Sequence, residues 1–285
     1  WYPSHLPMPH HHDVGEGLER TEAFWTEWSA RSTYDGPYEE AVQRSLITLK
    51  AMTYQPTGGI VAAPTTSLPE QIGGVRNWDY RYCWLRDAFF VVRALNSLSE
   101  VATMEEYLRW LNNVVVRSGG GHIQPLYGIG QEGRLPEAIL THLPGYRGQG
   151  PVRVGNQAQE HFQHDVYGNI ILGASQSFHD HRLFRRAGQA EFSHLEAVGE
   201  QAYRIYDQPD AGMWELRTRA RIHTSSALMS WAACDRLAKG ASTLRLPERV
   251  RYWRERADEI RQRILSEAWN DQRQAFAESF GGRDL

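Results

Sequence analysis

The sequence predicts an all-α fold: an array of helical hairpins with long loops gathered at one end. Apolar residues recur at three- and four-residue spacing through most of the 285-residue chain, which is the pattern of amphipathic helices. No strand–helix alternation of the kind that forms parallel sheets is present. The helical stretches are separated by long segments rich in Gly, Pro and aromatic residues, at 54–86, 119–155 and 207–223. Loops of this length inside a compact domain are usually functional, so we expect them to converge on one rim.

Eight helices are expected, each from its own apolar stripe. The first spans Glu19–Ser32, where Phe24, Trp25 and Trp28 fall on one side. The last spans 248–269 and is charged on its outer face. Its core stripe consists of Val250, Trp253, Ala257, Ile260, Ile264 and Leu265. The helices between them are expected at 37–52, 88–99, 102–117, 161–182, 194–206 and 225–239.

Residues 1–17 are expected to form a linker, because they contain three prolines and two glycines. His10, His11 and His12 also lie in this segment. Consecutive histidines in such a segment are solvated more often than they bind a structural metal ion, so no metal site is predicted there.

Composition excludes several classes of partner. The 31 basic and 34 acidic side chains give a net charge of −3, which provides no extended cationic field for nucleic acid. Apolar runs are far shorter than the roughly 18 residues that a membrane span requires, so no membrane partner is expected. No targeting segment precedes the first helix, and two cysteines cannot form a disulfide framework. Both features favour a cytoplasmic location.

The aromatic and basic residues leave two interpretations open. The chain has ten Trp, and its only lysines are Lys50 and Lys239, so nearly all basic residues are Arg. Mutational bias in the genome would explain the arginines without any function. Alternatively, planar guanidinium donors and flat rings suit polyhydroxylated ligands, because the donors bond hydroxyls and the rings cover the C–H faces of a sugar.

The segment Asn77–Asp87 places alternating aromatic residues next to an Arg–Asp pair. Its aromatic residues alternate, so that an extended backbone would place all of them on one side: Trp78, Tyr80, Tyr82 and Trp84. The adjacent pair Arg86 and Asp87 offers a donor fork and an acceptor for vicinal hydroxyls at the closed end of a pocket. The alternative is a buried aromatic strand, with Asp87 merely capping a helix that begins at Ala88.

This segment resembles the signature of glycoside hydrolase family 15, the glucoamylase, glucodextranase and trehalase family, in its bacterial form. Further matching motifs follow in the family's order at Thr53–Glu70, His142–Gly148, Pro151–Asn156 and Gly212–Arg217. The resemblance implies an (α/α)6 toroid of six helical hairpins with a funnel-shaped site at one end. In bacterial members a β-sandwich domain precedes the barrel.

The resemblance also implies domain boundaries. Residues 1–17 would be the linker from a missing N-terminal β-sandwich domain, and residues 18–285 a partial (α/α)6 catalytic domain. The family continues beyond Leu285, so we expect the toroid to be incomplete at its C-terminal end. The family's general base, a glutamate near the end of the barrel, is accordingly expected beyond this residue. Glu278 and Asp284 lie near the terminus but in the wrong motif for that role.

Glu215 is implied by the resemblance to be the general acid that protonates the glycosidic oxygen. A proton donor needs a raised carboxyl pKa, which partial burial beside Trp214 could provide. Trp214 itself would stand beside the cleaved bond. Arg86 and Asp87 would hold the glucose at the non-reducing end of the substrate, in the innermost subsite.

The remaining site residues follow from the same matching motifs. Tyr80 and Trp84 would line the innermost subsite, and Arg153, Asn156 and Arg217 are expected to bind substrate. Fungal glucoamylases have a second glutamate directly after the acid, where this chain has Leu216. This difference leaves the linkage preference open.

Other candidate residues have ordinary structural interpretations. His161, His164, His179 and His181 are expected at the surface or in the core, because a metal site needs more convergent ligands. Cys83 has no obvious histidine partner, so packing is favoured over nucleophilic catalysis. No metal and no cofactor are predicted.

Three functions remain open. The leading expectation is an inverting, exo-acting, glucoamylase-like glycoside hydrolase that releases β-D-glucose from non-reducing ends of α-glucosides. An α,α-trehalase of the same family is the nearest alternative, since both share the inner glucose subsite. A non-catalytic carbohydrate-binding toroid is the alternative from another class. The expected partner is an oligosaccharide or disaccharide, and the oligomeric state is left open.

Overall fold

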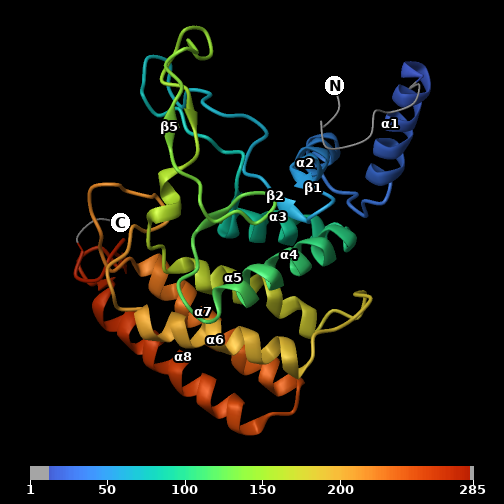
Figure 1. The fold of residues 1–285 in the computed structure, drawn as a ribbon. Helices are drawn as coiled ribbons and strands as arrows, with labels where there is room; N and C mark the ends of the chain where they lie inside the picture. Colours follow the sequence, from blue (N-terminus) through green and yellow to red (C-terminus); the bar gives the residue numbers. More distant parts are fainter. Residues whose placement is uncertain (1–12, 283–285) are drawn as a thin grey trace.

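The computed structural model describes residues 13–282, and this part of the chain contains eight α-helices (Figure 1). They are α1 Val14–Ser29, α2 Glu39–Ala51, α3 Leu85–Ser97, α4 Ala102–Ser118, α5 Asp165–Ser175, α6 Gln189–Ile205, α7 Thr224–Thr243 and α8 Pro247–Glu267. Each expected helix has a counterpart, although that of 161–182 is much shorter than predicted. The run from His10 to His12 lies outside the described residues.

The helices are stacked as hairpins in two layers. Helices α3, α5 and α7 pack side by side in one layer, while α4, α6 and α8 lie next to one another in the second. Figure 1 shows α3 and α4 at one end of the stack and α7 and α8 at the other. Helix α2 packs on α3 at the first end, and α1 packs on α2. The predicted array of helical hairpins is confirmed.

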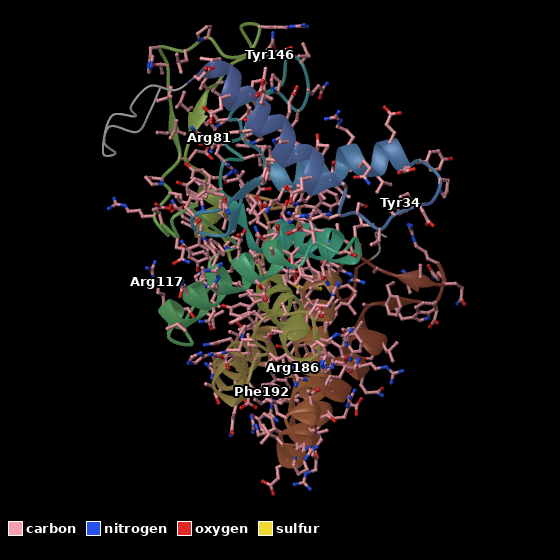
Figure 2. The ribbon with its side chains drawn as sticks, turned by 90° about the vertical axis from the view of Figure 1, so that its right-hand side faces the viewer. Tyr34, Arg81, Arg117, Tyr146, Arg186 and Phe192 are labelled. Atoms are coloured by element: carbon pink, nitrogen blue, oxygen red, sulfur yellow. The ribbon has the colours of Figure 1, made fainter. Side chains whose placement is uncertain are left out.

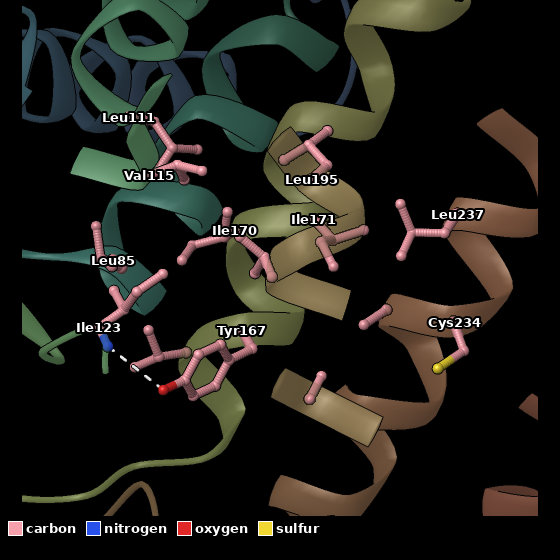
Figure 3. Close-up of a cluster of buried hydrophobic side chains, with 14 of the residues drawn as sticks. Leu85, Leu111, Val115, Ile123, Tyr167, Ile170, Ile171, Leu195, Cys234 and Leu237 are labelled. Carbon is pink, nitrogen blue, oxygen red and sulfur yellow. Dashed lines mark hydrogen bonds between the residues drawn. The ribbon is translucent and has the colours of Figure 1, made fainter. Parts of the chain in front are cut away.

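The apolar patterns explain which layer each helix joins. Helix α5 is buried all round because it lies between α3, α6 and α7, and Ile170 and Ile171 point to opposite neighbours (Figure 3). Tyr167 of this helix accepts a hydrogen bond at its hydroxyl from the Ile123 backbone N–H at 3.3 Å. On α8, four of the six predicted stripe residues are buried, whereas Leu265 is 42% exposed.

Gly168 permits the close approach of α5 and α7. A Cβ atom at this position would lie 2.3 Å from the backbone carbonyl oxygen of Met229. We therefore expect Gly168→Ala to lower the free energy of unfolding by about 1–3 kcal/mol, because the two helices must move apart. Thermal or denaturant unfolding would measure the change.

Gly17 supplies the matched control, since a Cβ there meets no atom within 4 Å in α1. Gly17→Ala should keep or raise stability, because Ala is favoured over Gly in a helix by about 1 kcal/mol. Equal stability of Gly168→Ala and the unaltered protein would show that the helices tolerate a wider separation.

Several helix boundaries differ from the prediction, such as the start of α6 at Gln189 in place of residue 194, and two of the differences have a clear structural cause. The stretch 161–182 is not one helix: α5 begins at Asp165 and passes into a 3-10 helix at Gln176–Phe178. Residues before it pair with a distant loop, since the backbone N–H of His164 donates to Asp210 Oδ2 at 2.8 Å. Helix α1 begins at Val14 and not at Glu19, so residues 14–17 form its first turn. The linker and the domain boundaries stay predictions. Asp13 caps this turn, accepting a hydrogen bond from the Gly15 N–H at 2.8 Å.

Four antiparallel pairs of two-residue strands tie the loops together within residues 13–282, and none forms a parallel sheet. The strands are β1 Thr53–Tyr54, β2 Gly59–Ile60, β3 Cys83–Trp84, β4 Leu126–Tyr127, β5 Ala138–Ile139, β6 Arg153–Val154, β7 Trp269–Asn270 and β8 Ala275–Phe276. Pairing of β3 with β4 joins the first long loop to the second. Figure 2 shows Tyr146, in the loop between β5 and β6, beyond the helical layers.

None of the helices in the described range is long and apolar enough to cross a membrane. Cys83 and Cys234 are buried and unpaired, and burial raises the pKa of both thiols to about 12. Packing is therefore their role, as predicted for Cys83. The cytoplasmic location stays a prediction.

Candidate active site

The signature segment forms the junction between β3 and α3. Strand β3 runs directly into the helix, and the Leu85 N–H donates to the Pro125 carbonyl at 3.0 Å. Arg86 and Asp87 are consequently the second and third residues of α3, at the end where the long loops meet. The alternative in which Asp87 caps a helix from Ala88 is wrong, because Trp84 occupies the N-cap position and Asp87 lies inside the first turn.

Arg86 is the centre of a charged cluster drawn from three segments of the chain. Its Nη1 donates a hydrogen bond to Gln163 Oε1 at 3.0 Å. Three carboxylates surround the guanidinium, with N···O separations of 3.5 Å to Asp87, 3.7 Å to Asp165 and 3.6 Å to Glu215. One cation therefore faces three potential anions, a balance that favours retention of a proton in the cluster.

Glu215 reaches this cluster from the third long loop. Its Oε1 accepts a hydrogen bond from the indole Nε1–H of Trp84 at 2.7 Å, and its side chain is 25% exposed. The burial does not come from Trp214, whose side chain turns to the surface and is 77% exposed. The expected contact between acid and tryptophan thus exists, but with Trp84 in place of its sequence neighbour.

Buried polar atoms without a hydrogen-bond partner gather around Arg86. Within the described residues these include Asp87 Oδ2, Gln163 Nε2 and Asp165 Oδ1. Burial raises the pKa of Asp87 against the attraction of Arg86, and Glu215 raises it further. Burial likewise raises the pKa of Asp165, which Arg86 opposes. Because buried polar groups are usually hydrogen-bonded, this concentration of unsatisfied atoms makes the surroundings of Arg86 a candidate binding site.

The rings of Tyr80 and Trp84 lie beside the carboxylates, while their place in a sugar subsite stays a prediction. Their rings pack with centroids 5.8 Å apart at a tilt of 53°. The Tyr80 hydroxyl donates to Glu70 Oε1 at 2.9 Å. Burial, this hydrogen bond and the nearby carboxylates all raise the pKa of Tyr80, so the phenol stays neutral. The two rings and the charged cluster together can hold a hydroxylated ring and donate a proton to it.

A family model described as glycosyl hydrolases family 15 matches residues 36–284. The chain belongs to glycosyl hydrolases family 15. A trehalase of Thermoplasma volcanium is 35% identical over 94% of this chain and 42% of its own length. A trehalase of Mycobacterium tuberculosis is 36% identical over 99% of this chain and 41% of its own length. The chain thus spans less than half the length of the curated relatives it matches.

Solved structures confirm the fold of this family 15 chain. A bacterial glucoamylase complexed with acarbose has a TM-score of 0.63 at 14% identity, covering 96% of this chain and 36% of its own. A glycosidase, E335A in complex with glucose, also scores 0.63 at 17% identity, covering 96% of this chain and 63% of its own. At such identities the likeness concerns the fold alone. The all-α, (α/α)6-type architecture predicted from the sequence is therefore confirmed.

Three expected substrate-binding residues of the family 15 motifs lie outside the Arg86 cluster and bond to the protein itself. Asn156 is buried, caps a short 3-10 helix and donates to the Asp79 carbonyl at 3.1 Å. Arg153 and Arg217 both contact Glu137 and both cover the ring of Trp78. We call these last four residues the Glu137 clamp. Their substrate contacts stay a prediction.

Sequence reasoning missed several residues of the family 15 site. Gln163 and Asp165, just before and at the start of α5, lie outside the recognised motifs and were not predicted as site residues. Glu137 carried no signal of its own, since one glutamate in a loop of Gly and Pro resembles any solvated residue. Among residues 13–282 no three His, Cys, Asp or Glu side chains are grouped as a metal site requires. The absence of a cofactor stays a prediction.

Proposed function

We propose that this chain carries the acid half of the active site of an α,α-trehalase, with Glu215 as the general acid. The observation that carries the proposal is the placement of the Glu215 carboxyl, bonded to Trp84 and 3.6 Å from Arg86 beside Asp87. A proton donor beside Arg86 and Asp87, where Asp87 Oδ2 lacks a hydrogen-bond partner, fits cleavage of a glycosidic bond. The trehalase names of the relatives support the choice of substrate.

In this mechanism the glucose whose anomeric carbon is attacked lies against Tyr80 and Trp84, and its hydroxyls bond to Arg86 and Asp87. Glu215 protonates the oxygen that leaves the anomeric carbon. Because the reaction inverts the anomeric centre, a second carboxylate must activate a water on the opposite face of the sugar, about 6.5–9.5 Å from the acid. Glu278 is held by Arg221 at 2.8 Å and is not assigned this role. We assign no general base among residues 13–282, and the trehalase relatives are more than twice as long as this chain.

The sequence analysis favoured a glucoamylase over a trehalase, and we now propose the trehalase. The recognised motifs belong to the glucose subsite that both activities share, so the motifs alone do not distinguish the two substrates. The trehalase relatives, with about a third of residues identical over most of this chain, favour the disaccharide. The structures of glucoamylase type support the fold and not the substrate.

The substrate preference and the anomers of the released glucose test the proposal. We expect the natural full-length protein to hydrolyse trehalose in preference to maltooligosaccharides, measured as initial glucose release at equal substrate concentration. Trehalose has two α-linked anomeric carbons, and inversion at one of them should release one β-D-glucose with one α-D-glucose. Proton NMR during the first turnovers distinguishes the two anomers before mutarotation.

Three other outcomes would contradict the proposal. Preference for maltooligosaccharides, with β-D-glucose as the first monosaccharide released, would identify a glucoamylase. Two α-D-glucose molecules from trehalose would indicate retention and a different chemistry. Sugar binding without any hydrolysis would favour the non-catalytic toroid.

A further inference from the structure

The Glu137 clamp joins the loop that carries Glu215 to the hairpin of β5 and β6. Arg217 Nη2 donates to Glu137 Oε2 at 2.8 Å, and Arg217 Nη1 donates to Gln157 Oε1, also at 2.8 Å. On the other side of Glu137, Arg153 Nε lies 3.2 Å from Oε1. One carboxylate thus holds two guanidinium groups, and its own side chain is only 17% exposed.

Trp78 completes the clamp as its packing surface. The guanidinium carbons of Arg217 and Arg153 lie 4.3 Å and 4.6 Å from the centre of its ring. Arg153 Nη1 also donates to the carbonyls of Val75 and Asn77, at 2.9 Å and 3.2 Å. Charged hydrogen bonds and cation–π contacts therefore fix the two arginines in place, which makes them support for the site and not free hydroxyl donors.

The clamp acts on Glu215 through a very short connection. Only Leu216 separates Glu215 from Arg217. On the other side of the acid, Gly212 packs against the ring of His223, where a Cβ atom would lie 2.7 Å from Nε2. Between these anchors the backbone of Glu215 adopts a left-handed conformation, with φ of 53°. A non-glycine residue holds this conformation only where its surroundings enforce it.

We propose that Glu137 is a positioning residue for the general acid: through Arg217 it fixes the loop so that the Glu215 carboxyl lies on Trp84 and Arg86. The inference rests on the proposed function, which makes Glu215 the acid. It gives Arg217 and Arg153 a role that differs from the substrate binding expected of them. Proton transfer requires the Glu215 carboxyl to lie within hydrogen-bond distance of the departing oxygen. Even a small displacement of the carboxyl therefore slows the reaction.

Charge on Glu137 holds the clamp together. Burial alone would raise the pKa of this carboxyl, but hydrogen bonds from Arg217 and Gln157 and the charges of Arg217 and Arg153 hold it below its ordinary value. The clamp is consequently intact at neutral pH and weakens only when Glu137 is protonated in acid. Glu137→Gln keeps the shape and removes the charge.

The inference is tested by comparing the loss of kcat in Glu137→Gln on two substrates that differ in their leaving group. In the natural full-length protein, Glu137→Gln should lower kcat on trehalose by about 10- to 100-fold, the value of one or two charged hydrogen bonds. On α-glucosyl fluoride, whose leaving group needs little protonation, the loss should stay within about threefold. Arg217→Gln should show the same selectivity, and the double variant should lose no more than either single one.

Asp235 offers the matched control. It joins α7 to α8 through Arg254 at 2.7 Å and also pairs with Lys239 at 2.9 Å, so that Asp235→Asn removes a comparable ion pair from the helical layers. Its effect should be equal on both substrates. An equal loss on both substrates for Glu137→Gln would overturn the inference while the proposed function stands. If Glu215→Gln itself is not selective, the acid assignment fails and the inference fails with it.

Discussion

Glu215→Gln should lower kcat on trehalose by about 10²–10⁴-fold with little change in KM, which is the usual contribution of a general acid. Glutamine keeps the shape and can still accept the hydrogen bond from Trp84, which is 2.7 Å long in the structure. It has no proton to release to the departing oxygen. Steady-state kinetics of the natural full-length protein would measure the loss.

A change of substrate separates proton donation from other roles of Glu215. The loss should shrink sharply on α-glucosyl fluoride, and the high-pH limb of the pH profile, which reports deprotonation of the acid, should disappear. Glu255→Gln, at an exposed position on α8, is the control for an ordinary loss of one surface carboxylate. If Glu215→Gln is equally impaired on both substrates, this residue is a positioning group or the base, and not the acid.

Asp87→Asn should reduce kcat/KM by about ten- to more than a hundredfold, because a hydrogen bond to a charged group contributes about 1.5–3 kcal/mol. The free energy of unfolding should not decrease. Burial raises the pKa of Asp87, so the folded chain binds its proton more tightly than the unfolded chain. The ionised carboxylate therefore costs stability as the pH rises above its unfolded pKa, and a neutral amide removes that cost at pH 7.

Asp180 provides a control of opposite sign. Hydrogen bonds from Arg182 hold the pKa of Asp180 below its ordinary value, so its charge stabilises the fold above the unfolded pKa. Asp180→Asn should lower the free energy of unfolding at pH 7 and leave kcat/KM unchanged. A loss of about 1 kcal/mol in stability for Asp87→Asn, without loss of kcat/KM, would identify Asp87 as a helix-terminal residue only.

The helices were predictable because their apolar stripes repeat over several turns. On α8, Trp253, Ala257, Ile260 and Ile264 are buried as the spacing indicates. Prediction failed where a distant partner decides the local structure. Residues 161–164 have a helical pattern, yet they pair with the loop that contains Asp210.

The site was predictable only where its residues are close in sequence. Trp84, Arg86 and Asp87 lie in one recognisable segment, and Glu215 lies in another. Their supporting groups are far away along the chain: Gln163 is 77 residues from Arg86, and Glu137 is 80 residues from Arg217. Local spacing contains no information about such pairs, which depend on how the loops of successive hairpins meet.

The loop that contains Glu215 tolerates changes in length less well than the neighbouring loops. Loops on the rim of a helical scaffold generally accept insertions, because their ends stay on rigid helices and their middles are free. The six residues from Gly212 to Arg217 are instead fastened at both ends, on His223 and on Glu137. One added residue would turn the carboxyl of Glu215 away from Trp84. Diversification of this site must therefore proceed by substitution around a loop of fixed length.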